Sequence, residues 1–130
     1  MRVLVLGASG MLGSSVVPVL ASAGFSVTAA ARGQGMLPGC ATALPCGDLR
    51  QPDTLRRVLD DARPGAVVNC AGLIKQRAEA NDSIAAIETN ALLPHRLAAP
   101  CAARGARLVQ IGTDCVFSGL PAGPRGSDGD

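Results

Sequence analysis

The sequence predicts an α/β fold in which a doubly wound parallel sheet is covered by helices on both faces. Short apolar runs without alternating polar residues recur along the chain, as in parallel strands that are buried on both faces. Segments with helical periodicity separate these runs, and a parallel sheet needs such crossover connections. The 130 residues, 48% of them hydrophobic and 17% charged, suffice for one domain with a buried core.

Three strands and one helix are expected in the first third of the chain. An apolar run at 2–6 predicts the first strand, and a helical pattern at 11–23 follows it. Gly24 ends this helix, and further strands are expected at 25–31 and 41–46. The apolar face of the helix is expected to contain Leu12, Val16, Val19 and Leu20.

Helix and strand alternate in the rest of the chain. A helix opens with Gln51, Pro52 and Asp53 and runs to Asp61. Its residues Leu55, Val58 and Leu59 are expected to face the sheet. A strand at 66–70, a long helical region at 83–103 and a strand at 107–111 follow. The right-handed crossovers of such a fold predict five parallel strands in the order 3-2-1-4-5.

Three prolines conflict with the helical pattern. Pro18 in the first helix and Pro100 in the last each remove a helical hydrogen bond, so we expect kinks or early ends there. Pro94 is expected to divide the long helical region into two pieces. Gly and Pro predominate near the end of the chain, which predicts a domain at 1–118 and a flexible tail at 119–130.

Charge and cysteine usage exclude several classes of function. The net charge of +2 is small and scattered, which argues against a nucleic-acid or acidic-membrane partner. No run is long enough for a signal or membrane segment, so we expect a cytoplasmic protein. The only histidine is His95, and the cysteines lack ligand spacing, so we expect no metal site and reduced, buried thiols. The cysteines are Cys40, Cys46, Cys70, Cys101 and Cys115.

The first strand and helix are joined by the glycine-rich segment Gly7-Ala8-Ser9-Gly10-Met11-Leu12-Gly13. Gly7 would allow a tight turn, Gly10 would admit a pyrophosphate, and Gly13 would let the helix pack near the strand. The phosphates would lie at the helix N-terminus, with Ser9 beside them. This pattern predicts a Rossmann-type dinucleotide site; the alternative is a tight turn without a ligand.

The end of the second strand bears on the choice of cofactor. An acidic residue usually accepts a hydrogen bond from the ribose 2′-hydroxyl of NAD at this place, but the chain has Ala31 there and no acid before Asp48. Arg32 could instead pair with a 2′-phosphate. The sequence therefore predicts NADP(H) in preference to NAD(H), with a solvated Arg32 at a strand end as the alternative.

Four motifs and Asn90 carry a resemblance to a known family. Over residues 1–119 the chain resembles the extended, sugar-nucleotide branch of the short-chain dehydrogenase/reductase superfamily, and within it the dTDP-4-dehydrorhamnose reductase family. The motifs are the glycine-rich segment, Gly47-Asp48-Leu49, Asn69-Cys70-Ala71-Gly72, and Ile111-Gly112-Thr113-Asp114-Cys115-Val116-Phe117-Ser118-Gly119. In the last of them Gly112 stands where the family commonly has serine.

With the glycine-rich turn and Arg32, the resemblance implies a cofactor site. The expected cofactor-binding residues are Gly7, Ser9, Gly10, Met11, Leu12, Gly13, Arg32, Asp48, Leu49, Asn69, Ala71, Gly72 and Asn90. Structural alternatives remain for some of them. Asp48 could cap the next helix, Asn69 could hold a turn, and Asn90 could lie on a helix surface. Lys75 follows the third motif and could approach a ligand or be a solvated loop residue.

The resemblance also implies a reductase of a nucleotide-activated 4-keto sugar. Thr113 matches the residue that holds the substrate carbonyl, and Asp114, Val116 and Phe117 are expected to contact substrate. The family's proton donor is a tyrosine, with a lysine four residues later, but the chain contains no tyrosine. We therefore expect an N-terminal fragment that binds cofactor without turnover, and an oligomer is compatible with the sequence.

Two other functions stay open. The related sugar epimerase and dehydratase branch shares the cofactor motifs, although the Thr113–Phe117 run favours the reductases. A non-catalytic NADP-binding or sensing module is the second alternative, because the chain lacks the tyrosine that catalysis in this family requires.

Overall fold

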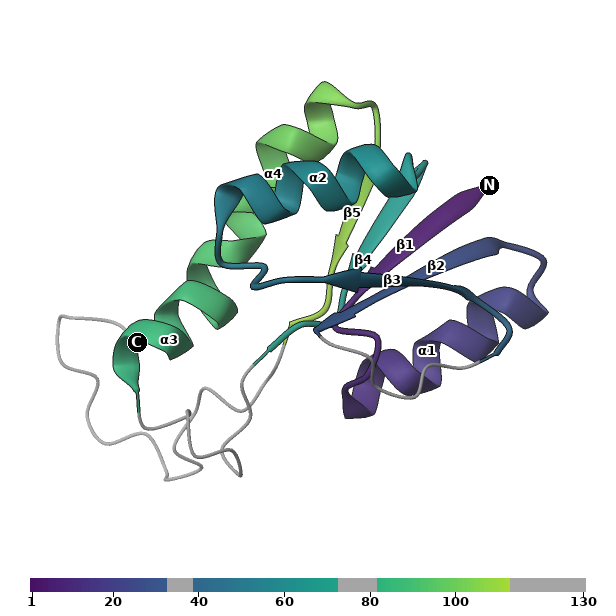
Figure 1. Ribbon diagram of the computed structural model, residues 1–130, viewed down its shortest axis with the longest axis horizontal. Helices are drawn as coiled ribbons and strands as arrows, with labels where there is room; N and C mark the ends of the chain where they lie inside the picture. Colours follow the sequence, from purple (N-terminus) through teal and green to yellow (C-terminus); the bar gives the residue numbers. More distant parts are fainter. Residues whose placement is uncertain (33–38, 73–81, 113–130) are drawn as a thin grey trace, which may run out of the picture.

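The computed structural model describes residues 1–32, 39–72 and 82–112, which form an α/β fold around one five-stranded sheet (Figure 1). All neighbouring strands are parallel, and their order is β3-β2-β1-β4-β5, as predicted. The strands are β1 (Arg2–Leu6), β2 (Ser26–Arg32), β3 (Thr42–Cys46), β4 (Ala66–Asn69) and β5 (Arg107–Gln110).

Helices cover both faces of the sheet. The helix α1 (Met11–Ser22) lies on one face, and α2 (Pro52–Ala62) and α4 (Leu93–Ala103) lie on the other (Figure 1). The short helix α3 (Ser83–Ala86) and the π-helical turn η2 (Ile87–Leu92) run directly into α4. The bounds of these elements differ from the expected ones by no more than one residue, because apolar periodicity and flanking Gly and Pro residues mark them clearly.

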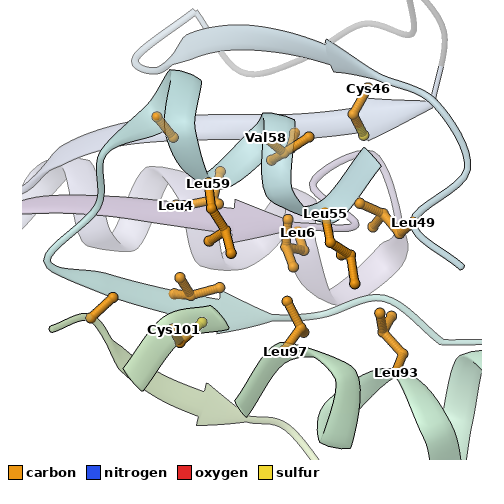
Figure 2. Close-up of a cluster of buried hydrophobic side chains, with 14 residues drawn as sticks. Leu4, Leu6, Cys46, Leu49, Leu55, Val58, Leu59, Leu93, Leu97 and Cys101 are labelled. Carbon is orange, nitrogen blue, oxygen red and sulfur yellow. The ribbon is translucent and has the colours of Figure 1, made fainter. Parts of the chain in front are cut away.

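The core consists of two apolar clusters, one on each face of the sheet. On one face, Leu4 and Leu6 of β1 pack against α2 and α4, where Leu55, Leu59 and Leu97 point toward them (Figure 2). On the other face, alternate residues of the same strands, among them Val3 and Val5, pack against Val17 of α1. Burial on both faces explains why the strands are continuously apolar.

The buried face of α1 differs from the predicted one. Gly13 and Val17 face the sheet, whereas Val19 is 67% exposed and Leu12 is 40% exposed. Val16 and Leu20 are partly buried and pack against the second cluster, as expected. The reason for the difference is the close approach of helix and strand at Gly13, which directs the line through Gly13 and Val17 toward the sheet.

Neither Pro18 nor Pro100 ends its helix. The helix α1 continues to Ser22 and α4 continues to Ala103, so of the two expected outcomes an early end does not occur at either position, and a kink stays a prediction. A proline removes its own N–H donor and crowds the preceding turn, but packing of the neighbouring residues Val17 and Cys101 in the core stabilises the rest of each helix.

Pro94 coincides with the expected division of the long helical region. It occupies the first turn of α4, and the preceding turn η2 has π-helical hydrogen bonding. The N–H of Leu93 donates to the carbonyl oxygen of Glu88, five residues earlier. Because Pro94 has no N–H and its ring crowds the preceding turn, the helix is wider there than a regular α-helix.

Two features, a membrane-spanning helix and a cluster of metal ligands, are absent from the described residues. Within residues 1–32, 39–72 and 82–112, no helix has the length and apolar character needed to cross a membrane. In the same part of the chain, no three His, Cys, Asp or Glu side chains lie together as metal ligands would.

Candidate functional site

A cleft of about 280 Å³ opens at the carboxyl ends of the strands, where β1 lies between β2 and β4. This is the edge at which open α/β sheets bind their ligands. Eight of the expected cofactor-binding residues line the cleft: Gly7, Ser9, Gly10, Arg32, Asp48, Leu49, Ala71 and Gly72. They come from separate segments that are far apart in sequence.

The glycine-rich turn has a different constraint at each of two positions. Gly7 has a φ of +70°, and a Cβ atom there would lie 2.7 Å from the backbone nitrogen of Ala71. A Cβ atom on Gly13 would lie 2.1 Å from the carbonyl oxygen of Gly7. Both positions therefore require glycine. Gly7 is needed for the positive φ of the turn and its contact with the segment after β4, and Gly13 is needed for the close packing of α1 on the turn.

Gly10 is constrained by space for a ligand and not by its backbone. Its φ of −73° is accessible to any residue, and a Cβ atom would meet only the carbonyl oxygen of Gly7, at 3.3 Å. Because Gly10 also lines the cleft, a larger side chain would occupy the space in front of the helix N-terminus. A cradle that a side chain would fill fits a bound pyrophosphate.

The N-terminus of α1 has free capacity for an anion. Gly10 is its N-cap and has no side chain, and the first turn contains no acidic residue. By contrast, Asp82 caps α3 by accepting hydrogen bonds from the N–H groups of Ile84 and Ala85. The side chains of Met11 and Leu12 do not line the cleft, so these residues can contribute only their backbone N–H groups.

Asn69 shapes the turn after β4 from within the core. Its side chain is fully buried, and its Oδ1 atom accepts a hydrogen bond of 3.1 Å from the N–H of Ala71. Its Nδ2 atom donates to Oε1 of Gln110 on β5 at 2.8 Å. Asn69 therefore holds the turn, as in the structural alternative, and it does not line the cleft; direct contact with a cofactor stays a prediction.

The turn that Asn69 holds also contains Cys70. Cys70 lines the cleft, and burial raises the pKa of its thiol, which is therefore kept neutral. Asn90 on η2 approaches the same turn, since its Oδ1 atom lies 3.4 Å from where a Cβ atom on Gly72 would be. The structure thus brings the third motif and Asn90 together at the mouth of the cleft.

Asp48 is bound to its neighbour Arg50. Its Oδ1 atom accepts hydrogen bonds from the N–H of Arg50 at 2.9 Å and from Nε at 3.0 Å, and its Oδ2 atom is 2.8 Å from Nη2. This hydrogen bonding from Arg50 holds the pKa of the Asp48 carboxyl below its ordinary value. The N-cap of α2 is Gln51, so Asp48 closes a local turn instead of capping the helix.

Arg32 stands at the end of β2 with its side chain exposed to the cleft. None of the ion pairs or side-chain hydrogen bonds recorded for the described residues includes Arg32. Ala31, its neighbour, lines the cleft and is buried. In that part of the chain the guanidinium of Arg32 therefore makes neither an ion pair nor a side-chain hydrogen bond, and it stands where the ribose of a dinucleotide is expected.

Four residues of the cleft escaped the sequence analysis. Arg50 follows the Asp48-Leu49 pair, and Ala85, Thr89 and Leu93 line the opposite wall from α3, η2 and α4. The last three are spaced by four residues and so lie on one helix face. This spacing was visible in the sequence, but nothing local indicated that the face borders a cleft and not the core.

Some sequence predictions cannot be placed. Lys75, Thr113, Asp114, Val116 and Phe117 lie outside the described residues, and so does the expected tail. His95 is exposed on α4 and does not line the cleft, as expected for a surface histidine.

Comparisons with known proteins agree with this geometry. A family model described as RmlD substrate binding domain matches residues 1–127. The dTDP-4-dehydrorhamnose reductase of Streptomyces griseus is 35% identical over 133 residues, which cover 95% of this chain and 40% of that protein. The chain therefore spans about two fifths of the length of this curated relative.

Solved structures show the same fold. The NAD complex of UDP-glucose 4-epimerase from Thermus thermophilus matches with a TM-score of 0.71 and 28% identity, over 83% of this chain and 36% of the other. The NADP complex of dTDP-4-dehydrorhamnose reductase from Bacillus anthracis matches with a TM-score of 0.69 and 24% identity, over 91% of this chain and 38% of the other.

Proposed function

Because the chain belongs to the RmlD substrate binding domain family, we propose that it is the cofactor-binding part of an NAD(P)-dependent reductase that acts on a nucleotide-activated 4-keto sugar. Family membership confirms the resemblance drawn from the motifs. The relatives that it matches are longer, so the activity and substrate of a whole protein belong to the proposal. The observation that carries it is the cleft between an uncapped helix N-terminus and the turn after β4.

Different residues of the cleft would bind different parts of a dinucleotide. The backbone from Gly7 to Gly10 and the N–H groups at the start of α1 would take the pyrophosphate. Asp48 and Leu49 would border the adenine of the dinucleotide. The Ala71–Gly72 turn would border the other end of the dinucleotide. When bound, the nicotinamide would supply the hydride that reduces a substrate carbonyl.

NADP(H) is the proposed cofactor. Arg32 is exposed and has no partner among the described residues, so its guanidinium is available to a 2′-phosphate. Ala31 offers no acceptor to a ribose diol. Together these residues give an expected preference of about 1–3 kcal/mol, which corresponds to roughly tenfold to hundredfold in affinity. Both NADP and NAD occur in the solved relatives, which supports a nicotinamide cofactor in general.

Turnover by the 130-residue chain is not expected. Thr113 would hold the substrate carbonyl, and Asp114, Val116 and Phe117 would contact the sugar nucleotide, but the chain has no tyrosine to protonate the oxygen. A non-catalytic NADP-binding module is the second candidate. Tight cofactor binding without NADPH consumption, with dTDP-4-keto-6-deoxy sugars present and in the protein's natural extract, would distinguish it.

Calorimetric titration of the chain with NADPH and NADH tests the proposal. We expect binding of both, with NADPH bound more tightly, and we expect Gly10→Val to abolish binding while circular dichroism shows an unchanged fold. Arg32→Ala should weaken NADPH and leave NADH nearly unchanged. Unaltered affinity in a folded Gly10→Val variant would remove the turn from the site, and equal affinities in the native chain would refute the preference.

A further inference from the structure

Three charged side chains line the cleft near the end of β2: Arg32, Asp48 and Arg50. Two of them are joined, since Asp48 accepts from the Nε, Nη2 and backbone N–H groups of Arg50 at distances between 2.8 and 3.0 Å. In this bidentate pair, both carboxylate oxygens of Asp48 accept hydrogen bonds from the guanidinium of Arg50.

Arg50 is itself held in place by residues of α4 and η2. Its carbonyl oxygen accepts a hydrogen bond of 2.8 Å from Nη1 of Arg96 on α4, and its own Nη1 atom is 3.7 Å from Oε2 of Glu88 on η2. The side chains of Arg50 and Asp48 are each about one third exposed. Arg50 is therefore fixed from two sides, and the pair it forms with Asp48 is not a loose surface contact.

Arg32 lies close enough to Asp48 to interact with it electrostatically. Both side chains line the same cleft, and the charge of Arg32 is the smallest of the contributions that lower the pKa of Asp48, the largest being the hydrogen bond from Arg50. After Arg50, Arg32 is the other cation in the described part of the chain whose charge lowers the pKa of Asp48. If Arg50 were neutral, the carboxylate would attract Arg32 and repel a phosphate in the same region.

We propose that Arg50 is a positioning residue for cofactor selectivity: by engaging the carboxylate of Asp48 it leaves Arg32 available for a phosphate monoester on the adenosine ribose. The inference rests on the proposed NAD(P) site. It extends that site by assigning a role to a residue that would not itself need to touch the phosphate. It also gives a reason why a cleft that contains the carboxylate of Asp48 can accept a 2′-phosphate.

The test compares the ratio of the dissociation constants of NAD⁺ and NADP⁺ in the native chain and three variants. Arg50→Gln should lower this ratio by about threefold to tenfold, because Asp48 is then free to oppose the phosphate and to pair with Arg32. Asp48→Asn should keep the ratio at or above the native value. The double variant Asp48→Asn/Arg50→Gln should return it to the native value, since the carboxylate that Arg50 neutralises has been removed.

Arg56→Gln is the matched control. Arg56 also pairs with an aspartate of its own segment, through a single contact of 2.9 Å to Asp53 on the exposed surface of α2 and away from the cleft. Its substitution should leave the ratio unchanged. Circular dichroism and thermal melting of each variant establish that the fold is retained.

Each alternative outcome has a definite meaning. An equal loss of affinity for NAD⁺ and NADP⁺ in Arg50→Gln would show that Arg50 only supports the fold of the loop, and would overturn the inference. A ratio that stays low in the double variant would overturn it as well, because Arg50 would then contact the phosphate directly. Failure of the native chain to bind either cofactor would overturn the proposed function, and this inference with it.

Discussion

Gly10 and Gly13 belong to one turn, yet the structure gives them different roles. A Cβ atom on Gly13 would lie 2.1 Å from the carbonyl oxygen of Gly7 and 2.7 Å from Cα of Ala8, both of them backbone atoms that cannot turn aside. The fold depends on Gly13, because α1 approaches β1 closely there. A Cβ atom on Gly10 would meet only the carbonyl oxygen of Gly7, at 3.3 Å, and would enter the cleft, so the role predicted for Gly10 is in ligand binding.

At the residue scale, we predict that Gly13→Ala destabilises the fold. The added methyl group forces α1 away from β1, which should lower the free energy of unfolding by about 3 kcal/mol. Urea denaturation followed by circular dichroism measures this change. Gly39→Ala is the control, since a Cβ atom there would meet no heavy atom within 4 Å. A Gly13→Ala variant as stable as the native chain would contradict the packing described for this turn.

At the element scale, the prolines of the helices differ in what they do. Pro94 lies in the first turn of α4 and accompanies the π-helical turn η2, which carries Thr89 and Asn90 beside the cleft. Pro18 lies inside α1, where the helix continues past it, and its side chain is exposed. Pro94 therefore accompanies a change of helix geometry near the cleft, whereas Pro18 removes a hydrogen bond within a helix that continues.

We therefore predict that Pro18→Ala stabilises the protein. Alanine restores a donor for the carbonyl oxygen of Ser14, and little packing is lost because Pro18 is exposed. The expected gain in the free energy of unfolding is about 1–2 kcal/mol, after allowance for the greater freedom of the unfolded chain.

The control for this prediction is Pro52→Ala in α2. Pro52 is the first residue of that helix, where no intrahelical donor is needed, so its replacement should bring no gain. Thermal melting compares the two variants. If Pro18→Ala melted at or below the native temperature, the helix would have to be relaxed around its proline.

At the scale of the whole molecule, the cysteines differ in how far the fold buries their thiols. Cys40 is exposed, Cys46 and Cys101 are buried in the core, and Cys70 borders the cleft. Burial raises the pKa of the Cys46, Cys70 and Cys101 thiols. Because the folded protein favours their neutral form, this contribution to stability is complete below about pH 9 and declines as the pH rises further.

We predict a definite order of alkylation at pH 8. Cys40 should react first, and Cys46 and Cys101 should react at least about a hundredfold more slowly, because they become accessible only when the core opens. NADPH should slow the reaction of Cys70 and leave that of Cys40 unchanged. Mass spectrometry of the peptides after timed labelling measures each rate.

The protection of Cys70 has its own control. In the Gly10→Val variant, NADPH should no longer slow the labelling of Cys70, since that variant is expected not to bind. Labelling of Cys101 as fast as that of Cys40 in the native protein would contradict the packing of α4 on the sheet.

Much of the fold could be predicted because its signals are local. Continuous apolar runs, helical periodicity, and the Gly and Pro residues between them specified the strands, the helices and their order. The Gly7-x-x-Gly10-x-x-Gly13 spacing likewise pointed to the edge of the sheet where the cleft opens, because each glycine lies close to atoms of the same turn or of the turn after β4. The roles of Thr113, Asp114, Val116 and Phe117 stay predictions, since these residues lie outside the described part of the chain.

Only the tertiary structure decided which side chains meet. Asn69 bonds to Gln110, 41 residues away, and Arg96 bonds to Arg50, 46 residues away, so no local pattern could show that one holds a turn and the other anchors a cleft wall. The face of α1 that is buried was set in the same way, by the close approach of Gly13 to the first strand. The periodicity of apolar residues shows which face of a segment can be buried. The packing of the whole chain determines which element that face contacts.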